Sequence, residues 1–325
     1  MPAPEHRLPP PSPAALAAIR DAIAPGGRVG RMRALSGGID ASMHALDLLD
    51  TTGQRTQVVV RRYGGAMLRH APELERGYRT LTLLARHGYP APRPLLFDPV
   101  GDLLGAPGYV MTRLPGRSSL VVRDLRLWTC RLAEALAALH GLPIPAADAP
   151  WLPEPAATVD ALLGPNKVRR LEGDAAGAAV LDVVRARWDT TERGTAVLCH
   201  GDYWPGNTLW RRGKLTGVVD WDSARIDSAY VDTGYCRLDL ALCIGQDAAD
   251  LFLAAYEAAT GTRLPDVPFW DLVASLRALP DPGVWLPSYR GTGRADITAA
   301  GLRANLAAFV QRALRALQTG GADRR

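Results

Sequence analysis

The most informative part of this sequence is Cys199-His200-Gly201-Asp202-Tyr203-Trp204-Pro205-Gly206-Asn207, followed shortly by Val218-Val219-Asp220-Trp221-Asp222. The 325 residues contain only three asparagines, and one of them lies five residues after Asp202. A chance His-Gly-Asp-x4-Asn pattern is expected in fewer than about one chain in a thousand. An isolated Asp and Asn beside Gly and Pro would usually indicate only a capped turn. Here the surroundings favour a functional site.

Two short strand-like runs follow, at 207–210 and 215–220, and they predict a hairpin whose turn contains Gly213. Asn207 and Asp220 are equally far along the chain from the centre of that turn, so we expect their side chains at its open end. An amide oxygen beside a carboxylate suits Mg²⁺ that takes its other ligands from phosphate and water. Asp202, just before the hairpin, could then address a substrate hydroxyl, which is the layout of phosphoryl transfer from a nucleotide.

The rest of the chain has a β-rich first third and a helical remainder. Ser12 can cap a short helix that runs to Ile23. Pro115-Gly116 separates the two parts, so we predict a loose Pro-rich arm at 1–12 and two lobes at 13–114 and 115–325. Strand patterns cover 28–35, 42–49, 56–62 and 109–112, and helical patterns cover 73–87, 121–141, 175–188, 229–242, 247–260, 268–279 and 295–318.

The charge is basic but scattered. Of 38 basic residues only Lys167 and Lys214 are lysines, and the excess of positive charge lies in residues 1–120, which carry +6. A nucleic-acid-binding protein would usually gather its basic groups into a stripe interleaved with aromatics, and aromatics are only 6% here. The composition therefore argues against a nucleic-acid partner.

The remaining sequence features predict a cytoplasmic protein without a membrane partner. No stretch of eighteen uncharged apolar residues occurs, and the start of the chain has no signal-peptide core. The four cysteines have neither C-x-x-C nor zinc-finger spacing, so we expect reduced, mostly buried thiols and no structural zinc.

The order of the motifs resembles the aminoglycoside phosphotransferase family, which has a protein-kinase-like fold. The resemblance therefore implies an α+β, two-lobed, protein-kinase-like fold, with a small β-rich N-lobe and a larger helical C-lobe. It spans roughly residues 30–260. The central motifs are His200-Gly201-Asp202-x4-Asn207 and Val218 to Asp222, and the outer ones are Leu35-Ser36-Gly37-Gly38, Gly88 to Pro94, Leu114-Pro115-Gly116, Ala133 to His140 and Asp232.

The resemblance also implies roles for individual residues. Asp202 would be the catalytic residue that orients or deprotonates the acceptor hydroxyl, and Asn207 and Asp220 would hold Mg²⁺. ATP, or GTP, would bind beneath residues 35–42. His200 and Asp222 would support these groups, although Asp222 could also be a metal ligand. The expected nucleotide-binding residues are Ser36, Gly37, Gly38, Arg61 and Thr112.

Two departures from the family pattern affect the nucleotide site. Where relatives place a lysine on the third strand, this chain has Arg61, which can still hold phosphate oxygens through its planar fork. A solvated strand-end arginine is the alternative, as is Arg62 in the same role on the opposite face. Where relatives have a glutamate to orient that cation, this chain has Gly77, and Glu73, one helical turn away, is the expected substitute.

The acceptor is less well defined by the sequence. Residues 196–260 carry a net charge of −4, which could favour a cationic acceptor or could simply be a solvated helical surface. The segment 285–294 is predicted to be a loop in which Trp285 and Tyr289 either stack on a ring or pack internally.

Two functions follow. The first is an ATP- and Mg²⁺-dependent O-phosphotransferase that acts on the hydroxyl of a small molecule such as an aminoglycoside, a macrolide or an amino alcohol. The second is a catalytically weak or inactive kinase-fold protein that binds a nucleotide or a partner, an idea motivated by Arg61 and Gly77. The complete Asp202, Asn207 and Asp220 set favours the first.

Overall fold

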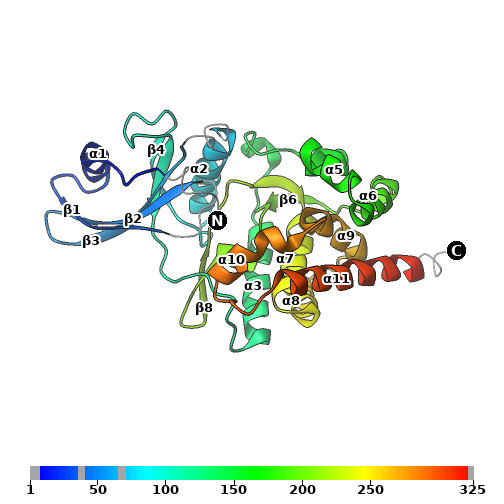
Figure 1. Ribbon diagram of the computed structural model, residues 1–325. Coiled ribbons are helices and arrows are strands. Elements are labelled where there is room, and N and C mark those ends of the chain that lie inside the picture. The colour runs from blue at the N-terminus through cyan, green and yellow to red at the C-terminus, as the bar shows by residue number, and fades with distance from the viewer. Residues whose placement is uncertain (1–7, 36–40, 65–70, 321–325) are drawn as a thin grey trace. The chain divides into compact units, whose positions relative to one another are not determined.

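The computed structural model describes residues 8–35, 41–64 and 71–320. The chain divides into two compact units (Figure 1), of which the first contains residues 1–116 together with 216–223 and the second contains 117–215 and 224–325. The segment 216–223, which the sequence analysis assigned to the second lobe, therefore groups with the first unit. Within the described residues, no helix is long and apolar enough to cross a membrane.

The first unit is built on a five-stranded antiparallel sheet with strand order β1-β2-β3-β5-β4. Helix α1 (Pro13–Ile23) begins at Ser12, whose hydroxyl accepts a hydrogen bond from the Ala15 N–H, and this confirms the predicted N-cap. Among its described residues this unit also contains helix α2 (Ala71–Arg86). The strands are β1 (Arg28–Ala34), β2 (Ser42–Leu49), β3 (Arg55–Arg62), β4 (Pro94–Asp98) and β5 (Gly108–Thr112).

Because side chains alternate along each strand, the two faces of this sheet carry different residues. One face forms a core in which Leu46, Val58 and Val110 pack with Ile19 of α1. The opposite face carries Arg61, because Arg61 pairs with Tyr109 and lies out of phase with Val58 and Val60. Val59 and Met111, which are also paired, share that face. The sheet thus buries its core on one side and presents the third-strand arginine on the other.

The second unit is mostly helical. Its central helix is α7 (Ala229–Cys243), which has thirteen buried residues out of fifteen and contacts α8, α9 and α11 (Figure 1). The remaining helices are α3 (Leu125–His140), α4 (Val159–Leu163), α5 (Pro165–Glu172), α6 (Ala175–Arg187), α8 (Gln246–Thr260), α9 (Val267–Ala278), α10 (Leu286–Gly291) and α11 (Ala299–Gly320), with short 3₁₀ turns η3 (Ala146–Asp148), η4 (Pro205–Asn207) and η5 (Pro282–Trp285).

Four short strands complete the fold as two pairs, β6 with β9 and β7 with β8. They are β6 (Ala196–Cys199), β7 (Thr208–Arg211), β8 (Lys214–Val218) and β9 (Arg225–Ser228). The β7–β8 pair is the predicted hairpin. Its two turn residues, Arg212 and Gly213, have φ angles of 51° and 75°, as a tight hairpin turn requires.

One predicted loop is helical in the structure. Residues 285–294, expected to be irregular, contain the end of η5 and the whole of α10. Pro287 lies in the first turn of α10, where its missing N–H costs nothing. Pro287 therefore marks the beginning of a helix in a segment that was expected to be a loop.

Candidate active site

The loop from His200 to Asn207 connects β6 to β7 and carries the residues singled out in the sequence. It leaves β6 through Gly201, whose φ of 78° is a conformation that favours glycine. At its other end, a Cβ on Gly206 would lie only 2.0 Å from the ring of Trp204. Gly201 is therefore favoured by its backbone conformation, and Gly206 by the position of the Trp204 ring.

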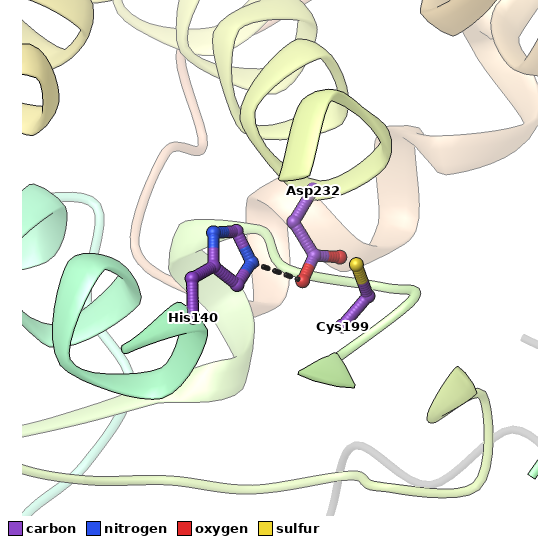
Figure 2. A group of neighbouring side chains, drawn as sticks. All are labelled: His140, Cys199 and Asp232. Carbon is purple, nitrogen blue, oxygen red and sulfur yellow. Dashed lines mark hydrogen bonds and ion pairs between the residues drawn. The ribbon is translucent and has the colours of Figure 1, made fainter. Parts of the chain in front are cut away.

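The first half of this loop is anchored by Asp232 of α7 (Figure 2). The two carboxylate oxygens of Asp232 accept hydrogen bonds from the backbone N–H groups of His200 (2.6 Å) and Gly201 (2.8 Å). Nε2 of His140, at the end of α3, lies 3.2 Å from the same carboxylate. Burial alone would raise the pKa of Asp232, but these contacts outweigh it, so the pKa lies below its ordinary value. A buried anion thus holds the loop where it leaves β6.

His140, Asp232 and Cys199 lie close together in Figure 2 and offer three atoms of the kind that bind metals, all within 4.8 Å. Hydrogen bonds already account for this arrangement. Nδ1 of His140 lies 2.7 Å from the Tyr256 hydroxyl, and the Cys199 thiol faces the carbonyl oxygen of Ser228 at 3.3 Å. Burial also raises the pKa of Cys199, which disfavours the thiolate that a metal would need. We therefore assign the cluster to anchoring the loop.

Asp202 and Asn207 are brought together by the fold of the loop. Nδ2 of Asn207 donates hydrogen bonds to the backbone oxygen and to Oδ2 of Asp202, both at 2.9 Å. Since the amide nitrogen is used in this way, the amide oxygen of Asn207 is the atom suited to a metal ion. The side chain of Asp202 is 27% exposed. One short turn thus supplies a partly exposed carboxylate and an oriented amide.

Arg277 of α9, which the sequence analysis missed, also contacts Asp202. Its Nη1 donates to the carbonyl oxygen of Gly201 at 2.9 Å, and its Nη2 lies 3.4 Å from Oδ1 of Asp202. The guanidinium lies over the ring of Tyr235, 3.7 Å from its centre. Nothing in the local sequence of Arg277 signals this contact, because the two partners are 75 residues apart.

A second buried acidic residue, Asp239, lies about two helical turns after Asp232 on nearly the same face of α7. Its Oδ1 accepts a hydrogen bond of 2.5 Å from the Tyr289 hydroxyl. Burial raises the pKa of Asp239 to about 7, with a further contribution from the charge of Asp202. Tyr289 is itself buried and lies edge-on to Trp204, so the internal-packing alternative holds for this tyrosine.

The first unit contains the remaining predicted residues, centred on Arg61. The guanidinium of Arg61 is buried and forks between two carboxylates, with Nη1 2.9 Å from Oδ1 of Asp220 and Nη2 2.6 Å from Oδ2 of Asp222. Burial opposes its charge, but Asp222, followed by Tyr109, Tyr63 and Asp220, raises the pKa well above its ordinary value. Arg61 is therefore a permanent, partnered cation and not a solvated strand end.

Asp220 and Asp222 follow β8 in a short turn. Asp220 has a φ of 71°, an uncommon conformation that Asp tolerates better than most residues. Between the two acids, Trp221 is buried, and its Nε1 donates to the Val218 carbonyl oxygen at 3.0 Å. The buried tryptophan therefore fixes the turn that presents the two carboxylates to Arg61.

Other predicted residues have different positions. Among the charged groups that raise the pKa of Arg61, Asp222 has the largest effect, and Glu73 is not one of the main contributors. Thr112 pairs with Val58 on the face opposite Arg61, and its hydroxyl accepts from the Arg93 N–H. Arg62 points to the other side, where it donates to the Leu104 carbonyl oxygen. Ser36, Gly37 and Gly38 lie outside the described residues.

Asn207 belongs to the second unit and Asp220 to the first. Each offers an oxygen ligand of the kind that Mg²⁺ prefers, so the donor chemistry fits that ion. The predicted meeting of the two side chains at the end of the hairpin stays a prediction.

Comparison with known proteins identifies the family to which these features belong. Residues 32–273 match the model of the phosphotransferase enzyme family. No curated protein matches the sequence. Solved structures with a similar fold include a Ralstonia eutropha protein assigned to the aminoglycoside phosphotransferases, with a TM-score of 0.66 at 16% identity, covering 93% of this chain and 98% of that one.

Two further structures have the same fold. Aminoglycoside phosphotransferase APH(4)-Ia, as a thermostable mutant in complex with AMP-PNP and hygromycin B, gives a TM-score of 0.62 at 16% identity and covers 92% of this chain and 98% of its own. Macrolide 2'-phosphotransferase type I gives 0.60 at 22% identity, covering 91% and 95%. These structures confirm the two-lobed, kinase-like α+β fold.

Proposed function

Because this chain belongs to the phosphotransferase enzyme family, we propose that it transfers the terminal phosphate of ATP or GTP to a hydroxyl group of a small molecule. Asn207 and Asp220 would hold Mg²⁺, and Arg61 would contact the phosphates. The ion, when bound, would neutralise charge on the transferring phosphate. The observation that carries the proposal is the Asp202–Asn207 hydrogen bond, in a loop that Asp232 anchors.

In this reaction Asp202 orients the acceptor hydroxyl and accepts its proton. The hydroxyl oxygen forms a bond to the terminal phosphorus, the bond from that phosphorus to the bridging oxygen breaks, and the nucleoside diphosphate leaves with the electron pair. Asn207 keeps Oδ2 of Asp202 in place, and Arg277 contacts Oδ1. Both contacts hold the carboxylate at the position from which it would accept the proton.

The acceptor class is tested by a panel. Similar folds include structures named for macrolide phosphorylation and for hygromycin B binding, so the panel contains aminoglycosides, macrolides and amino alcohols. Purified protein is incubated with MgATP or MgGTP and each acceptor, and mass spectrometry reads the addition of one phosphoryl group. At least one acceptor should gain it.

The matched variants are Asp202→Ala and Asp182→Ala. Asp182 lies on α6 with a side chain that is 76% exposed, so its loss should leave transfer unchanged. Loss of Asp202 should lower kcat by about a hundredfold or more, as for other groups that accept a proton in the transition state. Equal release of nucleoside diphosphate by the wild type and Asp202→Ala with every acceptor would refute the proposal.

The second candidate function is nucleotide binding without turnover. The observation that favours it is the engagement of Arg61 with two carboxylates, which compete with phosphate for the same guanidinium. Calorimetry would then detect tight MgATP binding by a protein that gives no phosphorylated product with any acceptor. Retention of Asp202, Asn207 and Asp220 favours the enzyme.

A further inference from the structure

Arg61 is held by two carboxylates that differ in burial. The side chain of Asp220 is 45% exposed, whereas that of Asp222 is 14% exposed. A buried ion pair is screened less by water than an exposed one, so the Asp222 contact fixes the guanidinium more firmly. It is also the shorter of the two contacts, at 2.6 Å against 2.9 Å.

Asp222 is itself immobilised from two sides. The Tyr63 hydroxyl donates a hydrogen bond of 2.5 Å to the same Oδ2 that receives Arg61. Nη1 of Arg76, on helix α2, donates to the backbone oxygen of Asp222 at 3.0 Å. Its side chain and its backbone are therefore both restrained, as a residue that orients another side chain must be.

Gly77 on helix α2 leaves the space that Asp222 occupies. A Cβ built on Gly77 would lie 2.4 Å from Oδ1 of Asp222 and 3.3 Å from the Tyr109 hydroxyl. Any larger side chain would displace the carboxylate. Glycine inside a helix costs about 1 kcal/mol relative to alanine, so its presence here calls for a packing reason. The carboxylate of Asp222 supplies that reason.

We propose that Asp222 is the positioning residue for Arg61. Because Gly77 has no side chain, it leaves room on α2 for the Asp222 carboxylate to reach Arg61. The inference rests on the proposed function, since Arg61 is the group that would contact the nucleotide phosphates. Arg61, Asp222 and Gly77 then act together. The carboxylate that orients the arginine comes from the turn after β8 instead of from helix α2.

The test measures MgATP affinity by calorimetry without acceptor, and then KM and kcat with an acceptor from the panel. Asp222→Asn keeps the shape of the side chain and removes its charge. We expect its MgATP affinity to fall, and its KM for the nucleotide to rise, by about ten- to a hundredfold, because a misplaced binding group costs up to about that factor. The KM for the acceptor should stay within about twofold of the wild type.

Two further variants separate positioning from folding. Gly77→Ala should raise the nucleotide KM, as Asp222→Asn does, because its methyl group would push the Asp222 carboxylate away from Arg61. The double variant Gly77→Glu with Asp222→Ala moves the carboxylate from position 222 to position 77. It should recover most of the MgATP affinity that Asp222→Ala alone loses. The control is Asp271→Asn, because Asp271 pairs with the buried Arg237 through two contacts of 2.9 Å in the second unit. It should lower thermal stability and leave MgATP affinity unchanged.

The outcomes are distinct. A folded Asp222→Asn protein with wild-type MgATP affinity and wild-type nucleotide KM overturns the inference while the proposed function stands. If Asp222→Asn does not fold, an unchanged nucleotide KM in Gly77→Ala overturns it instead. A wild-type protein that neither binds MgATP nor phosphorylates an acceptor overturns the proposed function and this inference with it.

Discussion

Asp239 gives the most quantitative prediction, because it is a buried carboxyl group close enough to Asp202 for that charge to act on it. Burial raises its pKa from an ordinary 3.8 to about 7, while the Tyr289 hydroxyl partly opposes that shift. In the unfolded chain the group returns to its ordinary pKa. The folded protein therefore keeps a proton that the unfolded chain has already released, over the range from about pH 4 to pH 7.

The sign and size follow from this difference. A carboxyl group whose pKa is raised on folding contributes its full stability below the pKa of the unfolded state and loses it as the pH rises through the folded pKa. At about 1.4 kcal/mol per pH unit, the free energy of unfolding contributed by Asp239 falls by about 3 kcal/mol between pH 4.5 and pH 7.5. Asp239→Asn cannot titrate and should lack this decline.

The assay is equilibrium unfolding in urea, followed by tryptophan fluorescence, at six pH values from 4.5 to about 8. The unfolding free energy of Asp239→Asn minus that of the wild type should rise by about 3 kcal/mol across the range. Asp182→Asn, an exposed carboxylate on α6, should follow the wild type throughout. Parallel curves for the wild type and Asp239→Asn would refute the reasoning.

Three other predictions follow from the second unit. Asp232→Asn should lower the free energy of unfolding by about 2–4 kcal/mol in urea titrations, because two buried backbone N–H groups lose their ionised acceptor; an unchanged midpoint would contradict this. Arg277→Met should lower kcat by about tenfold with little effect on MgATP affinity, since Arg277 contacts Asp202 and Gly201; a change confined to the affinity would argue against it. A thiol reagent should label only Cys130 in the native protein, because the other three thiols, Cys199, Cys236 and Cys243, are buried. Mass spectrometry of the modified peptides measures this, and rapid labelling of a second cysteine would contradict it.

Local patterns in the sequence predicted most of the fold. Helices α3, α6, α7, α8 and α9 begin and end within four residues of their expected bounds, because hydrophobic periodicity and capping residues act over one or two turns. Helix α5 was not predicted, because a Gly-Pro pair usually marks a turn, whereas here Pro165 lies in the first turn of the helix. The same local ambiguity explains α10.

The candidate site could be predicted only in part. The pairing of Asp202 with Asn207 could be anticipated from the sequence, because both residues lie in one short loop with a distinctive spacing. The partners of Arg61 could not be predicted, since Asp222 is 161 residues away along the chain and its carboxylate lies where a side chain at Gly77 would reach. The expectation that Glu73 orients Arg61 rests on helical spacing alone and stays a prediction, since such spacing contains no information about a turn elsewhere in the chain.

The division of the chain between its two units also limits how it can be cut. A fragment that ends at residue 116 would keep Arg61 but lose Asp220 and Asp222, which belong to the same unit through residues 216–223. A buried charge stripped of its partners costs about 3–5 kcal/mol, a large share of the stability of a small domain. The N-terminal unit is therefore not a modular piece of sequence. Any truncated form made for crystallography or display would have to carry 216–223 on a linker.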